Sequence, residues 1–125
     1  IDVLAITQNV LTELGVDNIV DSLNNKEWGQ SAKEDLTNLW NNAIGESVRT
    51  QMDREMNGRP VLSLEYLSAL YPISGPWNLM QSLWNDSQSA LDCPVIVLIP
   101  GELTASRHYR FLGKVDEFMY RGDLL

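Results

Sequence analysis

The stretch from Cys93 to Gly101 constrains the fold of this 125-residue chain more than any other. Five consecutive aliphatic residues, 95–99, stand between two prolines and lead to a glycine. The run is too short for a helix, and it lacks the alternation of a strand with one face in water. It therefore predicts a central strand of a parallel sheet, buried on both faces and covered by helices on each side.

Helical patterns fill most of the N-terminal half. Asp2 is placed to cap a first amphipathic helix, and Gly15 is placed to end it. Ser31 and Glu34 have the spacing of a capping box just before a long apolar pattern, so they predict the start of the longest helix. We expect three helices in this half, over residues 2–14, residues 17–24 and residues 31–56.

The C-terminal half predicts strands around a fourth helix. Residues 61–64 are a candidate strand, and Pro76 is placed to begin a helix in which Trp77, Met80 and Trp84 share one face and are interpreted as core. Together with the 95–99 strand these segments form a βαβ unit, whose crossover is expected to be right-handed. A further strand is predicted over residues 108–112, and residues 117–125 are expected to form either another strand or a C-terminal tail.

The predicted fold class is α/β, with a helical N-terminal half packed on a small, mostly parallel sheet and Rossmann-like layering. A chain of this size is expected to form one domain over residues 1–125, and its start at Ile1 without methionine is consistent with a piece of a slightly longer protein. One cysteine and one histidine make a disulfide or structural zinc site unexpected. No apolar run is long enough for a membrane span, so we expect a cytoplasmic protein without membrane contact.

The net charge of −8 disfavours direct binding of DNA by the body of the chain, because a phosphate backbone would be repelled. Residues 101–125 differ, since they hold four acids and four bases. Basic and aromatic residues alternate there, which is typical either of a nucleic-acid-binding surface or of a strand that contacts another protein. The residues concerned are Arg107, His108, Tyr109, Arg110, Phe111, Lys114, Tyr120 and Arg121.

No catalytic pattern stands out, so we expect no enzyme activity and no cofactor. Gly113-Lys114 lacks the spacing of a phosphate-binding P-loop, and the nearby Ser106 and His108 come without a nucleophile elbow. Cys93 is interpreted as a small apolar residue whose thiol pKa is raised by Asp92. Ligands of open α/β sheets bind at the carboxyl ends of the strands, so the loops 71–75 and 100–102 are a candidate site for a nucleotide or another small molecule.

Several segments, taken in order, resemble the BrxB family of BREX bacteriophage-exclusion systems. They are residues 1–4, 70–72, 79–83, 94–101, 111–113 and 120–121. The resemblance implies a non-catalytic component of a multi-protein antiphage complex, acting in assembly or regulation. Its implied partners are an adenine methyltransferase, an ATPase and a phosphatase-like protein, with DNA contacted only through them.

The resulting hypothesis is a protein-binding subunit. The alternatives are a nucleic-acid-binding module and a degenerate nucleotide-binding domain. The predicted contact surface combines the strand-end loops with the basic and aromatic cluster, and consists of Tyr71, Pro72, Pro100, Gly101, Arg107, Arg110, Tyr120 and Arg121.

Overall fold

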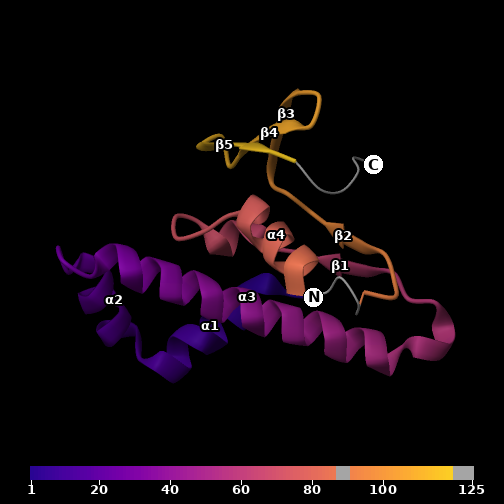
Figure 1. Cartoon of the computed structure of the whole chain (residues 1–125), viewed down its shortest axis with the longest axis horizontal. Coiled ribbons are helices and arrows are strands. Elements are labelled where there is room, and N and C mark those ends of the chain that lie inside the picture. The colour runs from indigo at the N-terminus through magenta and orange to yellow at the C-terminus, as the bar shows by residue number, and fades with distance from the viewer. Residues whose placement is uncertain (87–90, 120–125) are drawn as a thin grey trace.

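The computed structural model describes residues 1–86 and 91–119 and is a mixture of helix and sheet, as predicted. Helices dominate the first half, and short strands dominate the second (Figure 1). In chain order the elements are α1 (Val3–Leu14), α2 (Val16–Asn24), α3 (Gly29–Arg54), η1 (Met56–Gly58), β1 (Leu62–Leu64), η2 (Leu67–Leu70), α4 (Pro76–Asp86), β2 (Val95–Val97), β3 (Gly101–Ala105), β4 (His108–Phe111) and β5 (Val115–Phe118).

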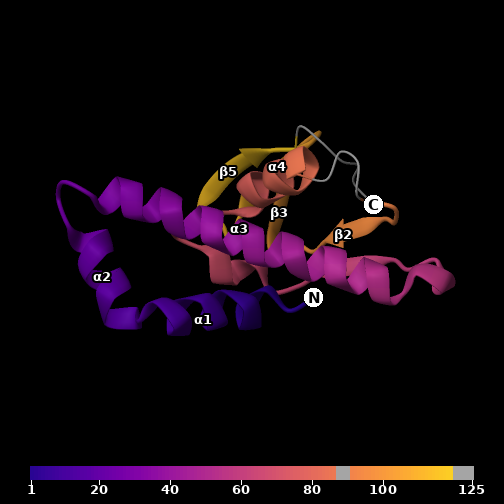
Figure 2. The same ribbon diagram turned by 60° about the horizontal axis from the view of Figure 1, so that its bottom comes forward.

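Two of the predicted helices lie along the long helix α3. The Asp2 side chain accepts a hydrogen bond from the Ala5 backbone N–H and caps α1, and Gly15 ends α1 with a positive φ of 86°. Both boundaries are as the sequence predicts. Figure 2 shows α1 and α2 on one side of α3, with α4 and the antiparallel strands on the other side.

The long helix α3 is present, but the predicted capping box at its start is wrong. The structure describes no side-chain cap at the helix boundary, and Glu34 accepts a hydrogen bond from Gln30 inside the helix. Asn25 instead orders the turn before α3, because its side-chain oxygen accepts from the backbone N–H groups of Glu27 and Trp28. The apolar face of α3 is buried at the predicted spacing, through Leu36, Trp40, Ile44, Val48 and Met52.

β1 and β2 form a parallel pair joined through α4, which confirms the predicted βαβ unit. Leu62 lies opposite Val95, and Leu64 lies opposite Val97. The first residues of the chain add to the other edge of β1, where the Val3 backbone N–H donates to the carbonyl oxygen of Glu65. β1 contacts α3, and the buried leucines of β1 belong to the same core as those of α4.

The expectation that β2 is a central strand, buried on both faces, is wrong. Val95, Val97 and Ile99 pack against the main core, but Ile96 belongs to neither core cluster and Leu98 is 50% exposed. In the described part of the chain, β2 pairs only with β1, and the second face of the sheet is not covered by the core. The Rossmann-like comparison is therefore loose.

The fourth helix is rotated relative to the prediction. Leu79 and Leu83 point into the core, whereas Trp77 is 43% exposed and Trp84 is 45% exposed. Both apolar rows of α4 fit a buried face, and the packing against α3 selects the leucine row, which joins the main core. Met80 contacts a second, smaller core under the antiparallel sheet.

β3, β4 and β5 form an antiparallel sheet in that order, separate from the parallel pair (Figure 1). The predicted small parallel sheet is thus accompanied by an antiparallel sheet, and β3 is a strand that the sequence did not predict. The 108–112 strand is confirmed as β4, where buried Tyr109 and Phe111 alternate with exposed His108 and Arg110. The last strand ends at Phe118, and residues 120–125 of its predicted range lie outside the described residues.

Candidate interaction surface and ligand pocket

The hollow at the carboxyl ends of the parallel strands is formed only in part by the predicted loops. The structure has a cavity of about 500 Å³ there, lined by residues 65–68 after β1 and 98–100 after β2. Pro100 is at this place, as predicted. The 71–75 loop is not, because η2 follows β1 and carries the chain away from the strand end.

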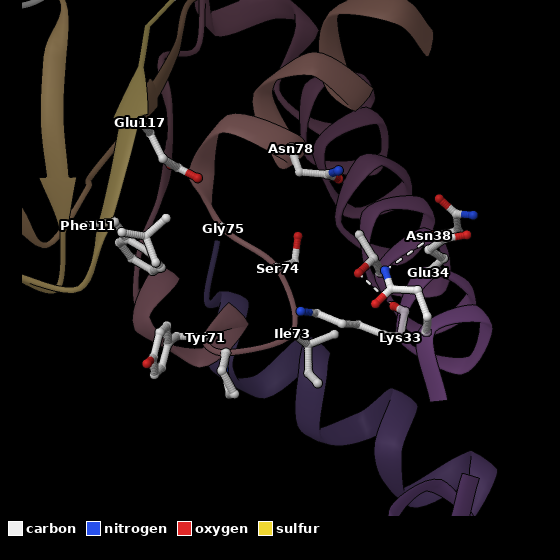
Figure 3. Close-up of a pocket in the computed structure, with 14 residues that line it drawn as sticks. Lys33, Glu34, Asn38, Tyr71, Ile73, Ser74, Gly75, Asn78, Phe111 and Glu117 are labelled. Carbon is white, nitrogen blue, oxygen red and sulfur yellow. Dashed lines mark hydrogen bonds between the residues drawn. The ribbon is translucent and has the colours of Figure 1, made fainter. Parts of the chain in front are cut away.

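The 71–75 loop instead lines a larger cavity of about 560 Å³ between the start of α3 and the antiparallel sheet (Figure 3). Its wall combines three parts of the chain that are far apart in sequence. They are the first turns of α3 (Gln30, Lys33, Glu34, Thr37, Asn38), the loop with the start of α4 (Tyr71, Pro72, Ile73, Ser74, Gly75, Asn78) and the sheet (Phe111, Val115, Glu117).

Glu117 connects the sheet to the start of α4. Its Oε1 accepts hydrogen bonds from the Trp77 backbone N–H at 3.1 Å and from the Tyr109 hydroxyl at 2.7 Å. A carboxylate is favourable at a helix N-terminus, where backbone N–H groups lack partners within the helix. Gly75 leaves room for it, since a Cβ at that position would lie 2.8 Å from Glu117 Oε2. The N-terminus of α4 is thus occupied by a carboxylate of the protein itself.

Burial and the hydrogen bond to Glu117 raise the pKa of the Tyr109 hydroxyl above its ordinary value. The hydroxyl therefore stays protonated, and remains a hydrogen-bond donor, above the pH at which an ordinary tyrosine ionises. Sequence patterns gave Glu117 no role beyond one more acidic residue. The sequence signal that could have indicated its role is the alternation of faces along β5. Asp116 pairs with Arg110 on the outer face, so the next residue, Glu117, lies on the inner face.

The polar groups around the cavity do not form a phosphate site. Two carboxylates, Glu34 and Glu117, face one ammonium group, that of Lys33, which extends from α3 toward the 71–75 loop (Figure 3). Ser74 has a buried hydroxyl for which the described residues provide no hydrogen-bond partner. The Asn78 side-chain oxygen accepts from Asn41 Nδ2 at 2.7 Å. This set favours a neutral or cationic polar ligand over a nucleotide.

Part of the predicted contact surface does gather around Phe111. The Tyr71 ring meets the Phe111 ring edge to face, with the centroids 6.4 Å apart, and Gly101 lies opposite Phe111 in the sheet. The Leu112 backbone N–H donates to the carbonyl oxygen of Pro100. Pro72 is exposed beside Tyr71. Tyr71, Pro100 and Gly101 thus approach one buried ring from different segments of the chain.

The basic members of the predicted surface are less available than the sequence suggests. Arg110 forms a 2.8 Å ion pair with Asp116 and lies opposite Glu102 on the neighbouring strand, so its charge is balanced by carboxylates on both sides. Arg107 lies in the turn between β3 and β4 with a positive φ of 59°. Tyr120 and Arg121 lie outside the described residues.

The alternation in β4 separates the basic from the aromatic side chains. Tyr109 and Phe111 are buried on the inner face, whereas His108 and Arg110 lie on the outer face. Bases of single-stranded nucleic acid stack on exposed rings, and these two rings are not exposed. His108 packs against Phe118 with its ring centroid 4.8 Å away, and its Nδ1 lies 2.8 Å from the Ser106 carbonyl oxygen.

Other predicted chemistry is sparse in the described residues. Burial and then Asp92 raise the pKa of the Cys93 thiol, which is the direction that the sequence predicts. Residues 1–86 and 91–119 contain no group of three or more metal-ligating side chains close enough to hold an ion. None of the helices in this part of the chain combines the length and apolar character needed to cross a membrane.

Comparisons with known proteins give no match: no family model, no curated protein and no solved structure is significantly similar to this chain.

Proposed function

We propose that this chain is a non-catalytic, protein-binding component of a BREX-like antiphage complex in the cytoplasm. Its partners in this proposal are the methyltransferase, ATPase or phosphatase-like proteins of such a complex, and DNA is contacted only through them. The family part of the proposal depends on the sequence resemblance. The structural support is one observation, the half-exposed tryptophans of α4.

Trp77 and Trp84 are two turns apart on one side of α4, with Met80 between them. The same helix buries its leucine row in the core, so the tryptophans lie on a part of α4 that the core does not cover. Tryptophan is enriched in protein interfaces and is common among the residues that contribute most to binding. The pair is therefore suited to contact a partner, and the net charge of −8 favours a partner with a basic surface.

The test is quantitative co-purification of tagged full-length protein from its native cells. A variant with Trp77→Ser and Trp84→Ser should recover at least tenfold less of the methyltransferase, ATPase or phosphatase-like partner. The hydrogen bond from the Trp77 backbone N–H to Glu117 does not involve the indole ring, so the fold should remain. Trp28→Ser is the matched control, since Trp28 is 65% exposed but precedes α3. Equal recovery by the double variant and the control would contradict the proposal.

A second candidate function is binding of a small polar ligand in the cavity beside α3. It is favoured by the Ser74 hydroxyl, which lacks a partner among the described residues, and by a volume typical of ligand sites. In a thermal-shift screen, compounds with hydroxyl, amide or amine groups should raise the melting temperature, and Ser74→Ala should remove the effect. Stabilisation by ATP or inorganic phosphate instead would contradict the charge argument and favour a degenerate nucleotide-binding domain.

A further inference from the structure

The charged side chains that line the cavity beside α3 differ in their exposure. Glu34 is exposed at the rim, where it accepts a hydrogen bond from Gln30. Lys33 and Glu117 are half-buried, and so is Ser74 of the loop between them. The inner part of the cavity therefore presents one ammonium group, one carboxylate and one hydroxyl.

The two inner charges come from different walls and do not pair with each other. Lys33 extends from α3 toward the 71–75 loop, and Glu117 extends from β5 (Figure 3). Lys33 has no ion-pair partner among the described residues. Glu117 uses its Oε1 for two hydrogen bonds within the protein, whereas its Oε2 lies in the space that Gly75 leaves open. Because burial without a partner is costly for a charge, both groups favour a ligand that brings the opposite charge.

The Ser74 hydroxyl is a third inner group without a partner. Its Oγ is buried, and the described residues provide no hydrogen bond to it. Most buried hydroxyls in folded proteins have a partner, so this one indicates a missing polar group. The Ser74 backbone N–H donates to the Leu70 carbonyl oxygen at 2.8 Å, which holds the loop in place and leaves the hydroxyl for a ligand.

The remaining inner wall is apolar. The Phe111 ring is fully buried, Ile73 is half-buried, and the Tyr71 ring packs against Phe111 from the loop side. Such a wall contacts a short carbon chain without requiring further hydrogen bonds. The cavity thus combines an apolar wall with one site for a negative group and one site for a positive group.

We propose that this cavity binds a small amino acid in its zwitterionic form. The carboxylate of the ligand contacts Lys33 and accepts a hydrogen bond from the Ser74 hydroxyl, and its ammonium group contacts Glu117 Oε2. An amine alone would leave Lys33 without a partner, and an organic acid alone would leave Glu117 Oε2 without one. This inference rests on the second candidate function, ligand binding in this cavity, and names the class of ligand.

The test is isothermal titration of the full-length protein with glycine, β-alanine and γ-aminobutyrate, in which the two charges are progressively further apart. At least one of them should bind. Propylamine and propionate each carry one of the two charges. They should bind about tenfold more weakly than the best amino acid, because each lacks one charged hydrogen bond.

Lys33→Met should weaken binding of the best amino acid about tenfold, because its carboxylate loses the ammonium partner. The same substitution should not weaken binding of propylamine. The Thr37 hydroxyl donates to the Lys33 backbone carbonyl and not to its side chain, so the helix should remain intact. Lys26→Met is the matched control, since Lys26 is exposed and does not line the cavity.

Equal affinity for propylamine and the best amino acid, or an unchanged affinity in Lys33→Met, would overturn this inference. Either result would leave the second candidate function standing, with an amine as the ligand. Absence of binding by all five probes would also overturn the inference. The thermal-shift screen would then decide the second candidate function separately, and the tryptophan variants test the protein-binding function in any case.

Discussion

At the scale of single residues, the Glu117 side chain connects the start of α4 to the antiparallel sheet. One of its carboxylate oxygens accepts hydrogen bonds from the Trp77 backbone N–H in α4 and from the Tyr109 hydroxyl in β4. Gly75, which has no side chain, leaves room for the carboxylate. The partners are 40 and 8 residues away in the sequence, so no local pattern marks the site. Its energetic effect can be measured through the ionisation of Tyr109.

The free energy of unfolding should decrease above about pH 10, partly because the Tyr109 hydroxyl ionises more readily in the unfolded chain than in the folded one. The folded-state pKa of Tyr109 is raised by burial and by Glu117, so above the ordinary tyrosine pKa the unfolded chain loses the proton while the folded chain keeps it. The unfolded state then binds fewer protons, and the free energy of unfolding decreases as pH rises. Urea denaturation between pH 8 and pH 11 should show a shallower decrease for Tyr109→Phe than for the wild type. Tyr66→Phe, at an exposed tyrosine, should match the wild-type slope.

Gly101→Ala should destabilise the protein by about 1–3 kcal/mol, because overpacking displaces neighbouring atoms. A Cβ at residue 101 would collide with the backbone carbonyl of Arg110, which cannot move without disturbing the β3–β4 pairing. Gly58→Ala is the matched control, since a Cβ there has no described atom within 4 Å. The measurement is the urea midpoint of each variant, and equal midpoints for the two would contradict the close approach of β3 and β4.

At the scale of elements, the start of α3 is ordered by Asn25 and not by the capping box that the sequence predicts at Ser31 and Glu34. Asn25→Ala should cost about 1 kcal/mol, because Asn25 accepts two backbone N–H groups before the helix. Ser31→Ala should leave stability almost unchanged, since Ser31 does not cap the helix. Chemical denaturation of both variants distinguishes the two sites. A larger loss of stability for Ser31→Ala than for Asn25→Ala would contradict this account and support the capping box.

The sequence predicted the helices well because their signals are local. Apolar spacing and the caps Asp2 and Gly15 define α1, and Pro76 marks the start of α4. The orientation of α4 was not predictable in the same way, since its tryptophan row and its leucine row are both apolar and only the neighbouring elements select one. β3 was missed because all five of its residues are exposed, which leaves no pattern of burial in the sequence.

The candidate site was only partly predictable for the same reason. Tyr71, Pro100 and Gly101 were named as one surface, and they do lie around Phe111. The position of the 71–75 loop was wrong because η2 separates it from the strand end. The lack of a second partner strand for β2 among the described residues was also not foreseen, because a continuous aliphatic run is typical of a strand buried on both faces.

At the scale of the whole molecule, two features support the proposed protein-binding function: the net charge of −8 and the half-exposed tryptophans of α4. Under the proposed function, we expect the protein to act inside a larger assembly, in which a partner covers part of the exposed tryptophan surface.

The most direct test of this central claim is the size of the particle that contains the protein in its native cells. Size-exclusion chromatography of a gentle lysate, with the tagged protein at its native level, should place it in a fraction far larger than its own mass. The methyltransferase, ATPase or phosphatase-like protein should elute in the same fraction and shift with it when the tag is bound by antibody. Elution at the mass of the protein alone would contradict the claim.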